Sequence, residues 1–453
     1  MNNTTSLNTS TKAILAVAIP MSLGAFVQFI VSFTDNYFVA SIDEFAMSGA
    51  AFVGLIYITL AMIGYGLGNA AQIIVARRNG ENQPTLAGRI TSNALILGAC
   101  IALLQFALLR FATPPLLDLL IESDQARYYM NEFLRFRAFG FFFYTPTLII
   151  HSFWSGIAQT RVMIYTTLIT ALVNIALDYC LVFGNVGFPE LGVSGAALAT
   201  SISEATAFVF LVIYTAKSTA NRDFGVFRQL LLPLKESHFL ADTKSLFKLG
   251  LPIIFQMVLS LLIWVIFYNL IEKLDGQSFQ SSFIIRNMYS LVWVSIMGFS
   301  TTAKTYVSGL IAEKRLTELW PTVRKLMLLN FCGVFLLSHG LWLYPEWITQ
   351  QFTDDPEVIR LTIQSMYIIL PAMYTFAFTS VLLGTVEGSG NTIAGFVVEL
   401  ATTVFYLITA YMLTIVWPQP VYIVWMSDYV YFIFLGLFSL YFLRNDAWKN
   451  KVI

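Results

Sequence analysis

Long apolar stretches recur along the whole chain, and each of them ends at glycine, proline or charged residues. A helix of about 20 apolar residues is long enough to cross a lipid bilayer. The pattern predicts twelve membrane-spanning helices, near residues 13–41, 46–76, 87–110, 131–157, 162–184, 193–216, 245–272, 279–311, 318–342, 358–386, 393–416 and 420–443. The predicted fold class is therefore an all-α polytopic membrane protein without a large aqueous domain.

The composition supports a membrane protein and excludes several other classes. Of the 453 residues, 57% are hydrophobic and 11% are charged, whereas about a quarter of the residues of soluble domains are charged. The net charge is zero, so no basic excess predicts a nucleic-acid partner. Cys100, Cys180 and Cys332 lie in apolar runs, and we expect them to be small buried residues rather than disulfide or metal ligands.

Lysine and arginine are distributed unevenly between the loops. Most of them lie in the two tails and in the loops after the second, fourth, sixth and eighth predicted helices, while the opposite loops are acidic or neutral, as at Asp118, Glu122 and Asp354. Loops rich in Lys and Arg face the cytoplasm. We therefore expect both termini to lie in the cytoplasm. We also expect a monomeric protein of the plasma (inner) membrane, in contact with membrane lipids.

The two halves of the chain repeat each other. Residues match at an offset of 232, for example Pro20 with Pro252, Val75 with Val307 and Gly156 with Gly388. The repeat predicts an N-lobe at 1–216, a cytoplasmic linker at 217–244 and a C-lobe at 245–453, with six helices in each lobe. An even number of spans gives both lobes the same orientation, so a pseudo-twofold axis along the membrane normal relates them, as in transporters that rock two bundles about a central site.

The segments that carry this repeat resemble the multidrug and toxic compound extrusion (MATE) transporters. The resembling segments are AIPMSLGAFVQFIVSFTDNYFVA, GNAAQIIVARRNGENQ, HSFWSGIAQTR, LVNIALDYCLVFG, LGVSGAALATSISE and LLGTVEGSGNT. The resemblance implies a twelve-helix antiporter that exports amphipathic, often cationic compounds in exchange for H⁺ or Na⁺.

Ionisable residues within the predicted spans are candidates for function, because a charge in hydrocarbon is costly unless it is paired or hydrated. Asp35 lies in the first predicted helix, with Gln28 seven residues earlier. Asp178 lies in the fifth, with Asn174 one turn earlier on the same face. In the H⁺-coupled proteins that this chain resembles, acids at these positions form a cation site. The alternative is that Asp35 caps or pins a kinked helix and that neither acid titrates.

Two further residues of this half have open alternatives. His151 is either a proton-relay group, because histidine titrates near neutral pH, or a hydrogen-bonded core residue. MATE proteins usually have an amide at its position. Glu204 either completes the polar cluster or bonds across helices.

The C-terminal half differs more from the family. At the positions where the resemblance implies an acid pair for Na⁺, this chain has Ser260 and Phe376. H⁺ is therefore the expected coupling ion, Na⁺ is less favoured, and no cofactor or metal is expected. We predict Glu387 to be a solvated gate residue near the cytoplasmic end.

Four residues are candidates for lining a substrate cavity. Glu399 and Asp428 lie deep in their predicted helices and either contact a cation or pair with Lys304 or Arg286. Aromatic faces suit flat organic cations, and Tyr37 and Tyr144 belong to aromatic clusters that either line a cavity or face lipid.

The sequence thus predicts a secondary active antiporter that exports small amphipathic, cationic organic compounds in exchange for H⁺ by alternating access. One alternative is a flippase for lipid-linked precursors, which would need more basic residues in mid-membrane. Another is a membrane-embedded lipid-modifying enzyme. Since the chain has three histidines and no recognisable catalytic motif, we expect it not to be an enzyme.

Overall fold

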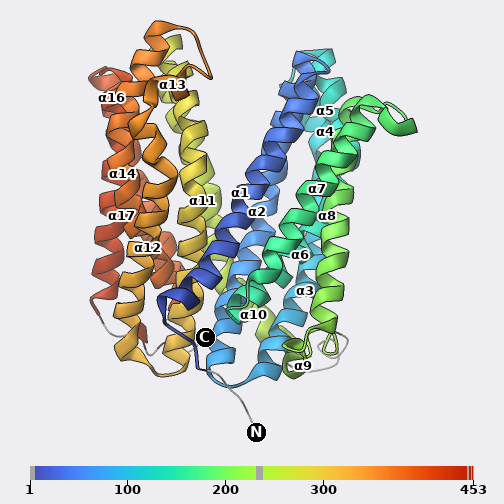
Figure 1. Cartoon of the computed structure of the whole chain (residues 1–453), viewed down its shortest axis with the longest axis vertical. Helices are drawn as coiled ribbons and strands as arrows, with labels where there is room; N and C mark the ends of the chain where they lie inside the picture. Colours follow the sequence, from blue (N-terminus) through green and yellow to red (C-terminus); the bar gives the residue numbers. More distant parts are fainter. Residues whose placement is uncertain (1–5, 231–237, 446–447, 450, 452–453) are drawn as a thin grey trace. The chain divides into compact units, whose positions relative to one another are not determined.

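The computed structural model describes residues 6–230, 238–445, 448–449 and 451, without the side chains at 25, 28, 29, 32, 33, 36 and 44. Its described elements are helices, with no strand among them, which confirms the predicted all-α class. Ten helices of the described residues are long and apolar enough to cross a membrane. The first predicted span lies in α1 and the fourth in α5 and α6, so all twelve predicted spans correspond to helical segments (Figure 1).

The elements follow one another along the chain in this order: α1 (Thr11–Ala40), α2 (Glu44–Gly80), α3 (Pro84–Ala107), the π-helix η1 (Leu108–Ala112), α4 (Thr113–Leu120), α5 (Asp124–Arg137), the 3₁₀ turn η2 (Ala138–Gly140), α6 (Phe141–Gly156), α7 (Arg161–Phe183), the 3₁₀ turn η3 (Asn185–Gly187), α8 (Gly192–Lys217), α9 (Asn221–Phe224), α10 (Phe239–Glu272), α11 (Gly276–Ala312), α12 (Leu316–Leu343), α13 (Pro345–Thr349), α14 (Pro356–Gly388), α15 (Thr392–Tyr411), the π-helix η5 (Met412–Val416), α16 (Val421–Val424) and α17 (Ser427–Leu443).

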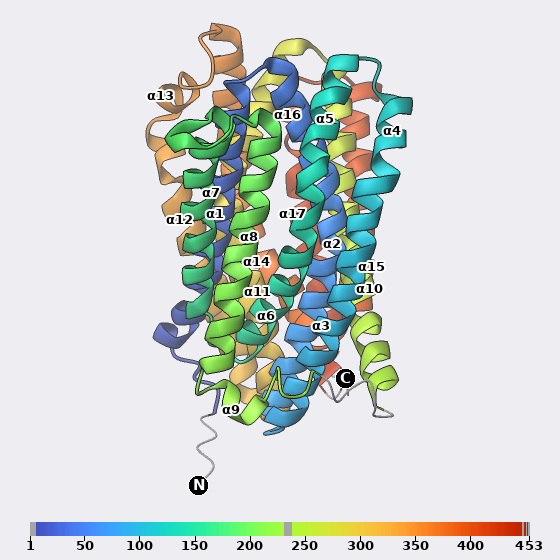
Figure 2. The same cartoon turned by 90° about the vertical axis from the view of Figure 1, so that its right-hand side faces the viewer.

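The chain forms two compact units. The N-unit is Leu23–Ile254, and the C-unit is Met1–Ser22 together with Phe255–Ile453. Within the N-unit, α7 packs along α8, and α2 packs against α3, α5 and α6 (Figure 2). Within the C-unit, α14 contacts α11, α12 and α17. Each unit thus buries its own helix faces.

The described N-terminal residues up to Ser22 are held by the C-unit. The backbone N–H of Leu7 donates to Glu313 Oε1 at 2.8 Å, and Arg315 Nη1 donates to the Leu7 carbonyl at 2.7 Å. The pKa of the Arg315 guanidinium is raised above its ordinary value, because Glu318 and Glu313 accept its hydrogen bonds. Paired acceptors therefore fix the arginine that anchors the N-terminal segment.

The same offset of 232 relates the helix boundaries of the two units. Helix α2 begins at 44 and ends at 80, and α11 begins at 276 and ends at 312. Both helices are capped by aspartate: Asp43 accepts from the Phe45 N–H at 2.7 Å, and Asp275 accepts from the Ser278 N–H at 2.6 Å. An N-cap carboxylate satisfies backbone donors that have no partner within the helix. The repeat therefore extends to the residues that start the helices.

The main departure from the predicted helices is at the fourth span. We predicted one helix at 131–157, but α5 begins at 124 and the 3₁₀ turn η2 separates it from α6. The early start escaped the prediction because its first turn contains Asp124, Gln125 and Arg127. The Ser123 hydroxyl accepts from the Ala126 N–H and caps the helix. The C-unit counterpart, α14, is continuous.

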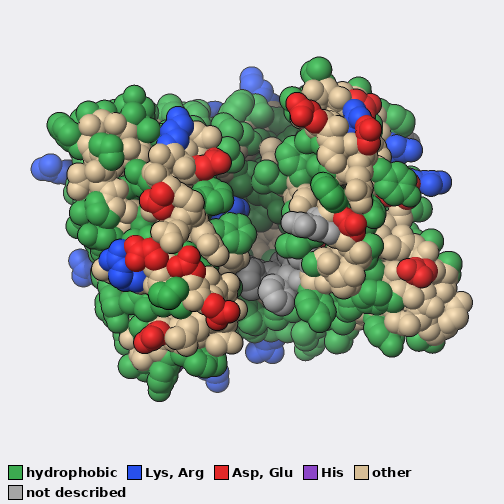
Figure 3. Space-filling view, turned by 90° about the horizontal axis from the view of Figure 1, so that it is seen from above, with side chains coloured by type: hydrophobic (Ala, Val, Ile, Leu, Met, Phe, Trp, Pro, Cys, Tyr) green, Lys and Arg blue, Asp and Glu red, His purple; other side chains and the backbone are tan. Residues whose placement is uncertain are grey.

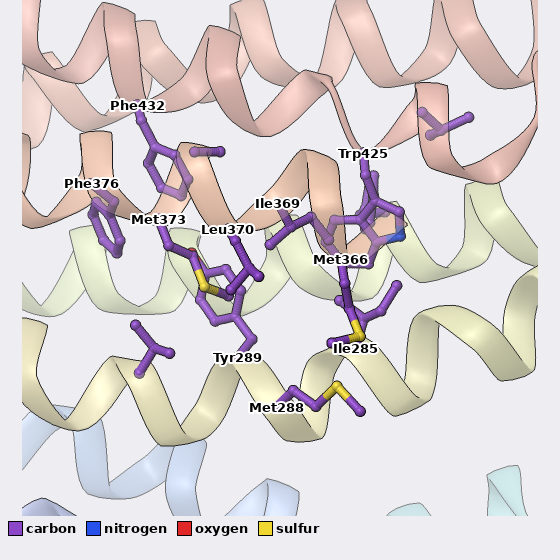
Figure 4. Close-up of a cluster of buried hydrophobic side chains, with 14 of the residues drawn as sticks. Ile285, Met288, Tyr289, Met366, Ile369, Leu370, Met373, Phe376, Trp425 and Phe432 are labelled. Atoms are coloured by element: carbon purple, nitrogen blue, oxygen red, sulfur yellow. The ribbon is translucent and has the colours of Figure 1, made fainter. Parts of the chain in front are cut away.

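The core of the C-unit is apolar and contains several large aromatic side chains. It is built from residues of α10, α11, α12, α14, α15, α16 and α17 (Figure 4). Trp425, Phe376 and Phe432 are buried in it, and the Phe376 and Phe432 rings stack with centroids 4.4 Å apart. Aromatic pairs of this kind add stability beyond the area they bury.

One expectation about the cysteines is wrong. Cys100 on α3 and Cys332 on α12 are exposed, and only Cys180 is partly buried. In a membrane helix an apolar outer face meets lipid, so an apolar surrounding sequence does not indicate burial in protein.

Acidic side chains are exposed in the segments that join the helices of each unit. The face of the molecule drawn in Figure 3 shows Asp and Glu side chains together with some Lys and Arg. The exposed acids of these loops include Asp118, Glu122, Asp124, Glu346 and Asp354.

Candidate functional site

Four polar side chains from three helices of the N-unit meet. Asn174 and Asp178 are one turn apart on α7 and are fully buried. Thr200 of α8 donates its hydroxyl to Asp35 Oδ2 at 3.2 Å, and Asn174 Nδ2 donates to the Thr200 hydroxyl at 3.3 Å. Asp35 and Asp178 are both placed in this network, and their carboxyl groups act on each other electrostatically. We call these four residues the carboxyl cluster.

Three of the four carboxyl oxygens in the carboxyl cluster lack a hydrogen-bond donor among the described residues. Neither oxygen of Asp178 nor Oδ1 of Asp35 has a donor among the side chains that the structure describes. Two carboxylates have only acceptor oxygens, so a hydrogen bond between them requires a proton on one of them. Buried like charges also disfavour double ionisation. The arrangement therefore suits a carboxyl pair that shares a proton.

A buried ion pair lies beside the cluster. Arg137 Nη1 and Nη2 donate to Glu204 Oε2 and Oε1 at 2.9 and 2.8 Å, and the Arg137 guanidinium lies 3.5 Å from the centre of the Tyr57 ring. Glu204 is one turn after Thr200 on α8, and Arg137 acts electrostatically on Asp35. Glu204 thus bonds across helices and adjoins the carboxyl cluster through its arginine.

The turn η2 makes room for this ion pair. A Cβ at Gly140 would collide with Arg137 Nη1 and Glu204 Oε2 and would lie 3.0 Å from the Tyr57 hydroxyl. Glycine at the end of the turn therefore lets the backbone approach the two charged groups.

The other predicted residues of this half lie in varied surroundings. The ring of His151 is hydrogen-bonded through Nε2 to the Thr166 hydroxyl at 2.8 Å, which is the contact expected of a core histidine. Tyr144 is half-buried with its ring edge toward Tyr57, and Tyr37 is 68% exposed. The side chain of Gln28 lies outside the described residues.

The predicted residues of the C-unit are buried. Glu387, predicted to be solvated, is 2% exposed and pairs with Lys304 Nζ at 2.7 Å. The prediction failed because α11 brings a lysine to this position, which the position of Glu387 in the sequence does not indicate. Glu399 accepts hydrogen bonds from Ser260 and Tyr431. Asp428 lies in the first turn of α17 and is 4% exposed.

Three residues of the N-unit network escaped the sequence analysis: Arg137, Thr200 and Tyr57. Arg137 had a usable signal, since it is a basic residue inside a predicted span. The only sequence signal for Thr200 was its position one turn before Glu204 on the same helix. No sequence signal distinguished Tyr57 from the many other aromatic residues. No group of three or more His, Cys, Asp or Glu side chains in the described part of the chain could hold a metal ion.

Comparison with known proteins identifies the family. The sequence model of the MatE family matches twice, at residues 20–180 and 252–412, so the second match is displaced by 232 residues. The chain belongs to the MatE family. The double match confirms the resemblance to MATE transporters and the internal repeat, and it indicates a transporter rather than an enzyme.

Individual relatives cover nearly the whole chain. A probable multidrug resistance protein NorM of Thermotoga maritima is 22% identical, over 98% of this chain and 94% of that protein. A multidrug export protein MepA of Staphylococcus haemolyticus is 23% identical, over 97% of this chain and 95% of that protein.

A solved structure has the same fold. A transporter of the MOP superfamily from Pyrococcus furiosus, whose description reports a binding pocket of reverse polarity, superposes with a TM-score of 0.87 at 18% identity, over 97% of each chain. This likeness confirms the two-lobe fold of this family member.

Proposed function

We propose that this transporter is a proton-coupled antiporter that exports small amphipathic, cationic organic compounds by alternating access. The observation that carries the proposal is that Thr200 joins Asp35 to Asn174, one turn from the buried Asp178. Asp178 also has no donor among the described side chains. Relatives described as multidrug resistance and export proteins support small organic substrates.

Charge competition supplies the coupling. With one shared proton the pair carries a single negative charge, and a second proton neutralises it. A cation is attracted to the charged pair and is released when protons take its place. The Arg137–Glu204 pair has no net charge, so it acts as a fixed dipole beside the cluster. The net charge of the site therefore depends on the protonation of the two aspartates.

The orientation follows from the loops. We propose that in each unit the acidic loops face outward, and that both termini are cytoplasmic in the plasma (inner) membrane, because cytoplasmic loops are rich in Lys and Arg. Protons then enter the cluster from the acidic outer side and leave to the cytoplasm. The transporter acts as a monomer, and H⁺ rather than Na⁺ drives it.

Efflux from liposomes tests the proposal. The purified full chain in liposomes should move a fluorescent organic cation when a pH gradient is imposed and fail to respond to a Na⁺ gradient. Asp35→Asn and Asp178→Asn should each reduce the pH-driven rate to that of empty liposomes, since an amide cannot exchange a proton. Asp118→Asn, which changes an exposed loop acid, should leave the rate unchanged. A rate that follows only Na⁺, or that survives both amide substitutions, contradicts the proposal.

A further inference from the structure

The C-unit contains two buried glutamates with different partners. Glu387 has a cationic partner, since Lys304 Nζ lies 2.7 Å from its Oε2. Glu399, also 2% exposed, has neutral partners. Its Oε1 accepts the Ser260 hydroxyl at 3.1 Å and the Tyr431 hydroxyl. Lys304 balances the charge of Glu387, whereas hydroxyl groups leave the charge of Glu399 uncompensated.

The elements packed around Glu399 bring no cation into contact with it among the described residues. Helix α17 contributes Tyr431, α14 contributes the already paired Glu387, and α15 itself carries Tyr406 two turns later. Helix α10 contributes the uncharged Ser260. An ionised carboxylate in this position is costly, because burial removes its hydration. A proton on Glu399 removes that cost.

Gln256 adds an independent observation. It lies one turn before Ser260 on the same face of α10 and is nine-tenths buried, and its Oε1 has no donor among the described residues. A buried amide oxygen without a donor is unfavourable. The Gln256 Oε1, on the same face of α10 as Ser260, is therefore available to accept a hydrogen bond from a protonated group.

We propose that Glu399 is a second proton-binding carboxyl, which takes up and releases one proton separately from Asp35 and Asp178. In the carboxylate form both hydroxyls donate to Oε1. In the acid form the added proton resides on the carboxyl group, and Tyr431 and Ser260 keep their own protons. This inference goes beyond the proposed function, because it adds a proton site in the other unit.

The two sites lie at different depths in corresponding helices. Glu399 is seven residues from the start of α15, or about 10 Å at the rise of an α-helix. Asp178 is 17 residues from the start of α7, or about 25 Å. The proposed site on α15 therefore does not occupy the helix position that corresponds to Asp178.

Infrared difference spectroscopy of the full-length protein in lipid tests the proposal directly. Spectra taken at about pH 5 and about pH 8 report the C=O stretch of every carboxyl group that changes protonation. Glu399→Gln should remove one such band, and the same band should persist in the Asp35→Asn/Asp178→Asn variant. Tyr431→Phe should shift the band, because one hydrogen bond to the carboxyl is lost.

A paired glutamate provides the control. The double variant Lys304→Met/Glu387→Gln removes both partners of the ion pair and should keep the Glu399 band. Identical spectra for the native protein and Glu399→Gln overturn the proposal, and a native-like thermal unfolding profile of the variant shows that it folds. Since the measurement needs no transport, it is independent of the outcome of the efflux assay.

Discussion

Corresponding positions in the two units carry polar and charged residues in the N-unit but apolar residues in the C-unit. In the N-unit, Arg137 lies over the Tyr57 ring, which stacks on Phe141 with centroids 4.1 Å apart. At an offset of 232 the corresponding residues of the C-unit are Ile369, Tyr289 and Met373, all of which belong to its apolar core (Figure 4). The tyrosine is kept, while the charge above it is replaced by an aliphatic side chain.

The carboxyl cluster differs in the same way. The counterparts of Asp35, Asn174 and Asp178 are Phe267, Tyr406 and Ala410. These three residues are buried in the C-unit core, and the Phe267 and Tyr406 rings are 5.6 Å apart. The same helix arrangement therefore supports a polar network in the N-unit and aromatic packing in the C-unit. The proposed proton coupling belongs to the N-unit, where polar residues replace the aromatic ones.

Breaking the ion pair of the N-unit should have the largest effect. Glu204→Gln leaves the buried Arg137 without its carboxylate, so we expect a loss of about 3–5 kcal/mol in the free energy of unfolding. The thermal unfolding midpoint in detergent measures it. Replacing both partners, as in Arg137→Met/Glu204→Leu, should recover most of the loss. If the single variant is as stable as the double variant, the pair does not hold this region together.

Moving an acid into the C-unit should have the next largest effect. Ala410→Asp places a carboxyl at the position that corresponds to Asp178, but inside an aromatic core without the polar partners of the cluster. We expect a loss of about 3 kcal/mol, measured in the same way. The reverse change, Asp178→Ala, should cost less in stability and abolish pH-driven efflux. A stable Ala410→Asp variant would show that the core of the C-unit accommodates a polar group.

The glycine of the turn η2 should have a smaller effect. Gly140→Ala pushes a methyl group against the Arg137–Glu204 pair, and overpacking of this kind costs about 1–3 kcal/mol. Gly54→Ala on α2 is the matched control, because nothing lies within 4 Å of a Cβ at that position. We expect the control to be neutral or slightly stabilising, since alanine favours helix. Equal effects at the two positions would mean that the close approach at Gly140 is not needed.

The sequence predicted the spans and the repeat because apolar length and helix-end residues are local signals. It also drew attention to Asp35 and Asp178, because an acid in an apolar run is conspicuous, and to Asn174, because it lies one turn from Asp178 on the same helix face. It did not predict the partners. The contact of Glu204 with Arg137 joins residues 67 positions apart, and that of Ser260 with Glu399 joins residues 139 apart. Such pairings depend on which helix faces meet, and a hydrophobic pattern does not encode that.

The helix caps provide the smallest test of the difference between the units. Asp355 caps α14, whereas its counterpart Ser123 caps α5. The pKa of Asp355 lies below its ordinary value of 3.8, because the Glu357 and Val358 N–H groups donate to the carboxylate. A carboxyl with a lowered pKa in the folded state stabilises the protein above its unfolded pKa, and this contribution is lost as the pH falls through the folded value. Asp355→Ser should therefore flatten slightly the decline in the unfolding midpoint between about pH 5 and about pH 3, and Ser123→Asp should steepen it. Parallel curves for the native protein and both variants would show that these caps do not contribute to the acid sensitivity.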